Sequence, residues 1–175
     1  MSSLTSTDLP LLAVLPLTAE AFAPFGDVIQ TEGRGHYPIN AGKVQRFHDL
    51  ASVDTAEAGG QPGISLFVAQ PYEMPLELVY VERHPLSSQA FIPLDDRPFL
   101  VIVAPADAEP SLATLRAFVT NGRQGVNYAR GVWHHVLIAV GRQQTFAIVD
   151  RIGTGPNCDR FDLAGANACS IDLPA

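Results

Sequence analysis

Lysine is nearly absent from this sequence: Lys43 stands alone beside ten arginines. Codon usage in a GC-rich genome explains such a ratio. The alternative is a need for planar guanidinium groups, which bind carboxylates through two hydrogen bonds. Composition leaves both explanations open. The basic residues form no cluster and the formal net charge is −7, which argues against binding to nucleic acid or to an anionic membrane surface.

Cysteine and long apolar runs are scarce as well. Cys158 and Cys169 lack the C-x-x-C spacing of a zinc ribbon, and two cysteines do not suggest a disulfide framework. Apolar runs such as residues 99–105 are far shorter than the roughly 18 residues that cross a bilayer. The polar N-terminus does not resemble a signal peptide. We therefore expect a cytoplasmic protein with no membrane partner.

Turn residues are abundant, with 14 glycines and 14 prolines among 175 residues. A chain of this length is one ordinary domain and buries about 70% of the surface that its unfolded form exposes, so it needs no metal or disulfide for stability. We predict one domain over residues 1–175, with residues 1–10 as a loose leader. The frequent turns favour many short strands over a few long helices.

The hydrophobic pattern predicts an all-β fold. A short helix is expected at residues 19–22, with Thr18 as its N-cap. Helical periodicity is scarce after that point, and turn signals separate eight short apolar or alternating segments. These segments are 44–48, 64–69, 76–82, 89–94, 99–104, 115–120, 133–140 and 145–150. Without long helices between the strands, the pattern indicates a sandwich or barrel with a minor N-terminal helix.

The first candidate site contains Arg46 and His48. Alternation along an extended segment puts both side chains on one face. A cation beside an imidazole can hold an anionic substrate and give it a proton. The alternative is a polar edge strand without a catalytic role.

The second candidate site is Glu82, His84 and Gln89. The even positions from 76 to 84 share one face of a strand, and that face changes from apolar residues to Glu82 and His84 at its end. If the apolar part fills a barrel, the two polar groups point into the barrel mouth, where a carboxylate and an imidazole can bind one divalent ion. Gln89 adds a neutral oxygen. The alternative is a surface ion pair between Glu82 and Arg83, with His84 as a capping residue.

The third candidate site is the Gly131-Val132-Trp133-His134-His135 turn. Alternation puts one histidine on each face of the following strand but does not decide which one faces inward. Gly131 to His134 resembles the second motif of the cupin superfamily, in which the histidine is a metal ligand. Glu82-x-His84 followed by Gln89 resembles a modified first motif, with Glu-x-His…Gln in place of His-x-His…Glu, so only two imidazoles remain.

Five segments in the same order resemble the ureidoglycolate lyase family over most of the chain: 19–29, 40–50, 82–94, 115–135 and 150–159. The resemblance implies an antiparallel, jelly-roll, cupin-like β-barrel, a homodimer, and a role in allantoin (purine) breakdown. The implied reaction cleaves (S)-ureidoglycolate to glyoxylate and urea. Nickel or a similar divalent metal is implied as cofactor, and no organic cofactor is expected.

The residues fit this chemistry. Loss of urea needs a base for the substrate hydroxyl, an acid for the departing nitrogen and a cation for the carboxylate. We expect the base to be Glu82, His84 or a metal-bound hydroxyl. The remaining expectations are His48 or His134 as the acid, Arg46 or Arg83 on the carboxylate, Asn127 and Tyr128 at the urea end, and Glu82, His84, Gln89 and His134 around the metal.

Other activities on a cupin-like fold stay open. These are another lyase, an isomerase or a dioxygenase acting on a small hydroxy acid, a hydrolase that releases ammonia, and a small-molecule-binding protein without catalytic activity. Gln89 at the position of the cupin glutamate keeps the last alternative open.

Overall fold

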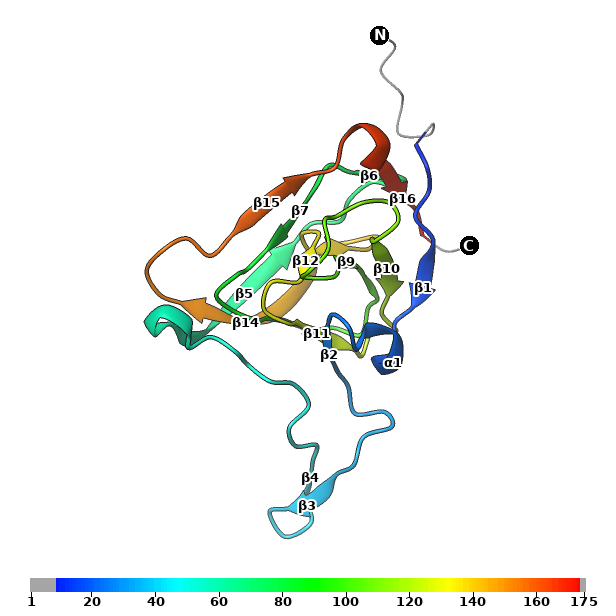
Figure 1. The fold of residues 1–175 in the computed structure, drawn as a ribbon. Helices are drawn as coiled ribbons and strands as arrows, with labels where there is room; N and C mark the ends of the chain where they lie inside the picture. The colour runs from blue at the N-terminus through cyan, green and yellow to red at the C-terminus, as the bar shows by residue number, and fades with distance from the viewer. Residues whose placement is uncertain (1–8, 174–175) are drawn as a thin grey trace.

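The computed structural model describes residues 9–173 as two antiparallel sheets that face each other (Figure 1). The five-stranded sheet has the order β2 (Gly26–Ile29), β11 (Gly125–Tyr128), β8 (Gln89–Pro93), β14 (Gln144–Ile152) and β5 (Gln61–Ala69). The seven-stranded sheet has the order β1 (Val14–Pro16), β10 (Arg116–Val119), β9 (Phe99–Ala104), β12 (Trp133–His134), β7 (Tyr80–Arg83) and β15 (Asp159–Asp162), and β13 (Ile138–Ala139) also pairs with β9. Only the β1–β10 pair is parallel among these described strands.

Smaller elements complete the fold. β16 (Cys169–Ile171) pairs with β6 (Leu76–Leu78), and β3 (Tyr37–Ile39) pairs with β4 (Val44–Arg46). Two 3₁₀ turns lie at Glu57–Gly59 and Gly165–Asn167. The helix α1 (Ala19–Phe22) is capped as predicted, since the Thr18 hydroxyl accepts a hydrogen bond from the Ala21 N–H at 3.1 Å. The predicted all-β fold with a minor N-terminal helix is confirmed.

The apolar run Phe99–Ala104 is buried on both faces of the seven-stranded sheet. Phe99, Val101 and Val103 pack between the two sheets, whereas Leu100 and Ile102 pack in an outer layer on the far side. A strand covered on both faces has no need for polar alternation. This explains why the segment is uniformly apolar.

One expectation about side-chain direction is wrong. The predicted strand 76–82 breaks at Val79, because β6 pairs with β16 while β7 pairs with β12 and β15. Leu78 therefore packs in the outer layer together with Val81, and does not fill the space between the sheets. Alternation resumes in β7, where it leaves Glu82 on the face opposite to Val81.

The leader predicted for residues 1–10 lies outside the described residues except for Leu9 and Pro10, and the Pro10 carbonyl already accepts a hydrogen bond from the Ser170 N–H. Among residues 9–173, no helix has the length and hydropathy needed to cross a lipid bilayer. The segment 31–50, called the arm below, carries the β3–β4 hairpin and projects away from the two sheets (Figure 1).

Candidate active site

Glu82 and His134 face each other across two paired strands. They are direct partners in the β7–β12 ladder, and 3.8 Å separates the Glu82 Oε1 from the His134 Nε2. Both side chains point between the two sheets, because Val81 and Trp133, their neighbours in sequence, belong to the outer layer. His134 thus faces the site. His135 points elsewhere: its ring lies 6.0 Å from that of Tyr80, and its Nδ1–H donates to the Val136 carbonyl.

His84 and Gln89 complete a cluster of four with Glu82 and His134. The His84 Nδ1 lies 2.6 Å from the Asn157 carbonyl oxygen, and its Nε2 lies 3.1 Å from the Gln89 Oε1. The Gln89 amide is oriented by Asp150, whose carboxylate accepts a hydrogen bond of 3.5 Å from the Gln89 Nε2. The amide oxygen of Gln89 is therefore the atom that faces His84. We call Glu82, His84, Gln89 and His134 the inner cluster.

Atoms with lone pairs converge at the centre of the inner cluster. The Nδ1–H of His134 donates to the Val132 carbonyl at 3.0 Å, so its Nε2 carries the lone pair. That Nε2 is buried and has no hydrogen-bond partner among the described residues. Ligand atoms of Glu82, His84 and His134 all lie within 4.8 Å of one another. A cation between acceptors that face each other in this way would satisfy their lone pairs, and a divalent metal ion fits this mixed set of nitrogen and oxygen donors.

Burial sets the charge of His134. The residue is 1% exposed, and this burial, followed by the nearby His84, lowers the pKa of His134 to about 3. The imidazole is therefore neutral near pH 7, which suits a metal ligand and not an acid. Tyr128 stacks on it with the ring centroids 4.4 Å apart and 16° between the planes. Burial, and secondarily Glu82, raises the pKa of Tyr128, so the phenol stays neutral as well.

The inner cluster opens into two adjoining cavities. The larger has a volume of about 550 Å³, and polar Glu82, Gln89 and His134 share its wall with apolar residues that include Phe67 and Leu137. The smaller, about 290 Å³, is lined by His84, Ser87, Gln89, Asp150, Arg151, Asn157 and Cys158. Burial, followed by Glu82, raises the pKa of the Cys158 thiol. Cys158 is consequently not an activated nucleophile.

Two predicted substrate-binding residues lie on the wrong faces of their strands. Arg83 is on the face of β7 opposite to Glu82, where it pairs with Asp159 at 2.9 Å and covers the Trp133 ring at 4.4 Å. Asn127 points away from the inner cluster and donates to the Asp27 carboxylate and to the Ser52 carbonyl. Strand alternation turns both side chains away from the two cavities.

Three further predicted residues have other positions. Tyr128 lies behind His134 and lines neither cavity, so it contacts the imidazole and not the cavity space. Arg46 and His48 do share one face, as predicted, with 3.2 Å between the Arg46 Nη2 and the His48 Nδ1. They lie on the projecting arm, however, and within one chain the structure does not bring them to the inner cluster (Figure 1).

The sequence prediction missed two residues that orient the inner cluster. Asp150 follows Phe146 and Ile148 on the inward face of β14, so the same alternation that marked Glu82 could have found it. Asn157 receives the His84 N–H through its backbone carbonyl, while its side chain accepts from the Leu86 N–H and donates to the Ser87 hydroxyl. Every residue type has a backbone carbonyl, so the sequence could not reveal this contact with His84.

Comparison with known proteins identifies a family for this chain. The model of a family described as "Ureidoglycolate lyase" matches residues 9–168. A protein of Burkholderia mallei named ureidoglycolate lyase is 55% identical over 152 residues, which cover 87% of this chain and 89% of that protein. A Pseudomonas syringae protein of the same name is 55% identical over 148 residues, 85% of this chain and 87% of the relative. Among solved structures, a dTDP sugar isomerase from Desulfovibrio desulfuricans G20 aligns with a TM-score of 0.45 and 15% identity over 82% of this chain and 87% of that one.

Proposed function

The chain belongs to the ureidoglycolate lyase family, and we propose that it cleaves (S)-ureidoglycolate to glyoxylate and urea with the inner cluster as its active site. One observation carries this proposal: the lone pairs of Glu82, His84 and His134 converge within 4.8 Å beside a cavity of about 550 Å³. A small hydroxy acid fits such a cavity, and polar atoms on one wall can orient its reacting carbon.

A divalent metal ion, nickel or one of similar preference, fits the inner cluster. His84, His134 and Glu82 would hold it, and the amide oxygen of Gln89 would add a neutral donor. The carbonyls of Val132 and Asn157 fix the two imidazole rings, as groups behind metal-ligating histidines commonly do. When bound, the ion supplies Lewis acidity toward the substrate oxygens.

In this proposal the carboxylate of Glu82 transfers the proton. Its carboxylate takes the proton of the substrate hydroxyl, whose oxygen then forms the carbonyl of glyoxylate as the carbon–nitrogen bond breaks. The departing nitrogen takes the same proton back from Glu82, so urea leaves neutral and no water is consumed. His134 takes no part as an acid, because its neutral ring donates its one N–H to the Val132 carbonyl.

The products distinguish this reaction from its rivals. Purified chain supplied with (S)-ureidoglycolate and nickel should release glyoxylate and urea in equal amounts. Ammonium in place of urea would indicate the hydrolase, oxygen consumption a dioxygenase, and no turnover a binding protein, and each of these outcomes would contradict the lyase.

The base is tested by Glu82→Gln, which preserves size and removes the charge. Loss of a general base lowers turnover by about 10²- to 10⁴-fold. Glu77→Gln is the matched control, since Glu77 is exposed on β6 and lies away from the inner cluster. Equal activity of the two variants would contradict the role of Glu82.

A further inference from the structure

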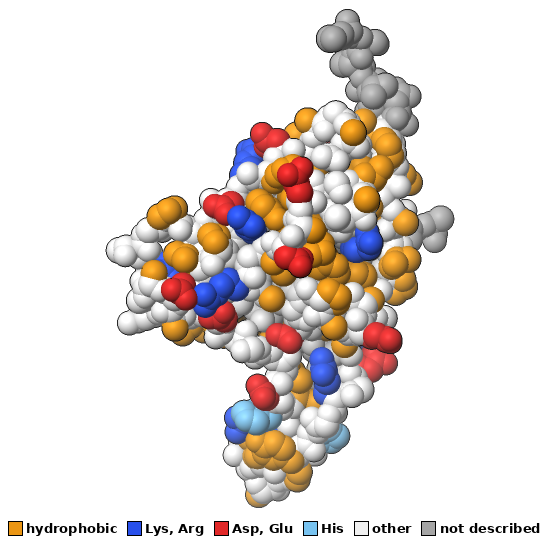
Figure 2. Space-filling model, viewed as in Figure 1, with side chains coloured by type: hydrophobic (Ala, Val, Ile, Leu, Met, Phe, Trp, Pro, Cys, Tyr) orange, Lys and Arg blue, Asp and Glu red, His pale blue; other side chains and the backbone are white. Residues whose placement is uncertain are grey.

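The arm exposes apolar side chains that nothing in the described part of the chain covers. Tyr37 is 43% exposed and Val44 42%, and Figure 2 shows apolar and histidine side chains on its surface. Among residues 9–173, no hydrogen bond or ion pair links positions 35–49 to the two sheets. A lone two-stranded hairpin is marginally stable in water. The arm therefore needs a surface on which to pack.

The outer face of the five-stranded sheet offers such a surface. Its apolar patch consists of Ile64, Leu66, Val68 and Leu94, which are 80%, 65%, 59% and 57% exposed. Ile64, Leu66 and Val68 belong to β5, an edge strand of nine residues. Long apolar edge strands and contiguous exposed apolar patches mark places where another chain docks.

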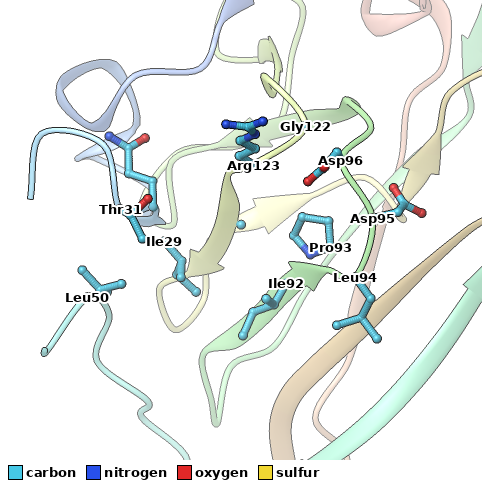
Figure 3. A pocket seen from close by; sticks show the side chains of 12 residues that line it. Ile29, Thr31, Leu50, Ile92, Pro93, Leu94, Asp95, Asp96, Gly122 and Arg123 are labelled. Atoms are coloured by element: carbon cyan, nitrogen blue, oxygen red, sulfur yellow. The ribbon is translucent and has the colours of Figure 1, made fainter. Parts of the chain in front are cut away.

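The apolar patch connects two hollows of the surface. At one end Leu94 lines a groove of about 370 Å³ together with Ile29, Leu50 and Ile92, beside the base of the arm (Figure 3). At the other end Leu66 and Val68 also line the larger cavity of the active site. A segment that packs along the patch therefore reaches the mouth of that cavity.

We propose that the arm of one copy of this chain packs on the apolar patch of a second copy and places Arg46 and His48 at the active site of that copy. Each chain has one arm and one patch, and both are uncovered in the described residues. In a dimer with twofold symmetry, each arm covers the patch of the other chain. Such dimers are the commonest assemblies of identical chains. The role of Arg46 rests on the function proposed above.

Charge favours this arrangement. Positions 31–50 contain three of the eleven Lys and Arg residues of the chain and two of its five histidines, but only two of its eighteen Asp and Glu residues. The two cavities present the carboxyl groups of Glu82 and Asp150. The arm thus has a net formal charge of +1 in a chain of net charge −7. Its cationic side chains complement the carboxyl groups of the cavities, and such complementarity helps to orient an interface.

The active site of a single chain also lacks an available cation for the substrate carboxylate, as far as residues 9–173 show. The guanidinium of Arg151, at the smaller cavity, donates to the carbonyls of Glu57, Ala58 and Thr154. Arg83 lies on the far face of β7 with Asp159. In the described part of the chain, the Arg46 guanidinium lies 3.2 Å from the His48 Nδ1 and 6.0 Å from the Tyr37 ring, and both partners belong to the arm. The arm of the second copy brings Arg46 to the site as the cation for the substrate carboxylate.

Analytical ultracentrifugation tests the interface without reference to catalysis. The wild-type chain should sediment as a dimer, and Leu66→Asp in the patch or Val44→Asp in the arm should each yield monomers. Val79→Asp is the matched control, because Val79 is 54% exposed but belongs to neither surface. A monomeric wild type, or dimers that survive both substitutions, would overturn the interface.

A mixed dimer tests the shared site. Arg46→Ala and Glu82→Gln chains carrying different affinity tags are co-expressed, and two successive purifications isolate the pair. Each variant alone should be inactive. In the mixed dimer one site combines an intact cluster with an intact arm, so turnover should recover to about half of the wild-type value per dimer.

The outcomes of this experiment are separable. If each arm serves its own chain, the mixed dimer stays inactive, and this result, or full activity of Arg46→Ala alone, would overturn the proposal. If the wild-type chain does not cleave ureidoglycolate, the proposed function fails, whereas the sedimentation result still decides whether the arm and the patch form the interface.

Discussion

The imidazole of His134 lies flat against the phenol ring of Tyr128, with the centroids 4.4 Å apart and 16° between the planes. Both rings are buried, and the Val132 carbonyl accepts a hydrogen bond from the Nδ1–H of the imidazole. The stack and the hydrogen bond together fix the direction of the His134 Nε2, the atom that lacks a partner in the described chain. We therefore predict that Tyr128 positions the imidazole of His134 for metal binding.

Tyr128→Leu should weaken metal binding by about two- to tenfold, since an aromatic pair contributes about 0.5–1.5 kcal/mol beyond its buried area. Tyr128→Phe keeps the stack and should bind as the wild type does. Calorimetric titration with nickel measures both affinities. If Phe and Leu weaken binding equally, the hydroxyl group and not the stack is the important part of Tyr128.

Gln89 is the neutral member of the inner cluster, and Gln89→Glu should tighten nickel binding by about tenfold, because added ligand charge raises the affinity for a divalent cation. The new carboxylate would face Asp150, whose oxygen now lies 3.5 Å from the Gln89 Nε2. Like charges at this distance disfavour each other. The metal-free variant should thus melt at a lower temperature than the wild type.

The double variant Gln89→Glu, Asp150→Asn serves as the control, because an asparagine amide can donate to the new carboxylate. It should retain the tighter nickel binding and recover the melting temperature of the metal-free protein. If the single variant binds nickel no better than wild type, the side chain of residue 89 does not face the ion.

The capping residue and the apolar run in the sequence predicted individual elements of the fold. Thr18 capped the predicted helix, and the run 99–104 forms a strand with the predicted bounds. Strand pairing was not predictable to the same degree. Residues 76–82 read as one strand, but the chain changes partners at Val79, and an alternation pattern says which face a side chain occupies without saying which strand lies beside it.

The proposed active site was also predictable only in part. Alternation within β7 places Glu82 on the inward face, and the same alternation in β14 places Asp150 there. The continuous face predicted from residue 76 to residue 84 does not exist, because Leu78 packs in the outer layer. The face shared by Arg46 and His48 was predicted correctly, and 3.2 Å separates their nitrogens. The position of the arm was not predictable, since alternation is a local signal and, in the described part of the chain, no hydrogen bond or ion pair links residues 35–49 to the two sheets.

Acid should destabilise the metal-free protein through His134. Burial, followed by His84, lowers the pKa of His134 from 6.5 to about 3 in the fold. Between these values the unfolded chain binds a proton that the folded chain does not, so the free energy of unfolding falls as the pH drops from 6.5 toward 3. Above pH 6.5 this contribution no longer changes.

Urea unfolding in the presence of a chelator, at pH 7 and at a pH near 4.5, measures the effect. His134→Gln removes the titrating ring and should lose less stability on acidification than the wild type. His36→Gln is the control, because it removes an imidazole that is exposed on the arm and lies outside the inner cluster. Identical pH dependence in wild type and His134→Gln would mean that other groups account for the acid sensitivity.

Nickel should raise the melting temperature of the wild type, because a ligand that binds only the folded state stabilises it. At about 100 times the dissociation constant the gain is about 2.7 kcal/mol. For a chain of this length that gain corresponds to a shift of about 5–10 °C.

His134→Ala leaves the cluster without its buried imidazole and should abolish the nickel-induced shift, although the cavity that it creates lowers the melting temperature in the absence of metal. His135→Ala is the matched control, because this adjacent histidine is also buried but faces Tyr80 and not the inner cluster. It should lose stability without metal and still gain the full shift with nickel. A shift that persists in His134→Ala would place the metal outside the inner cluster.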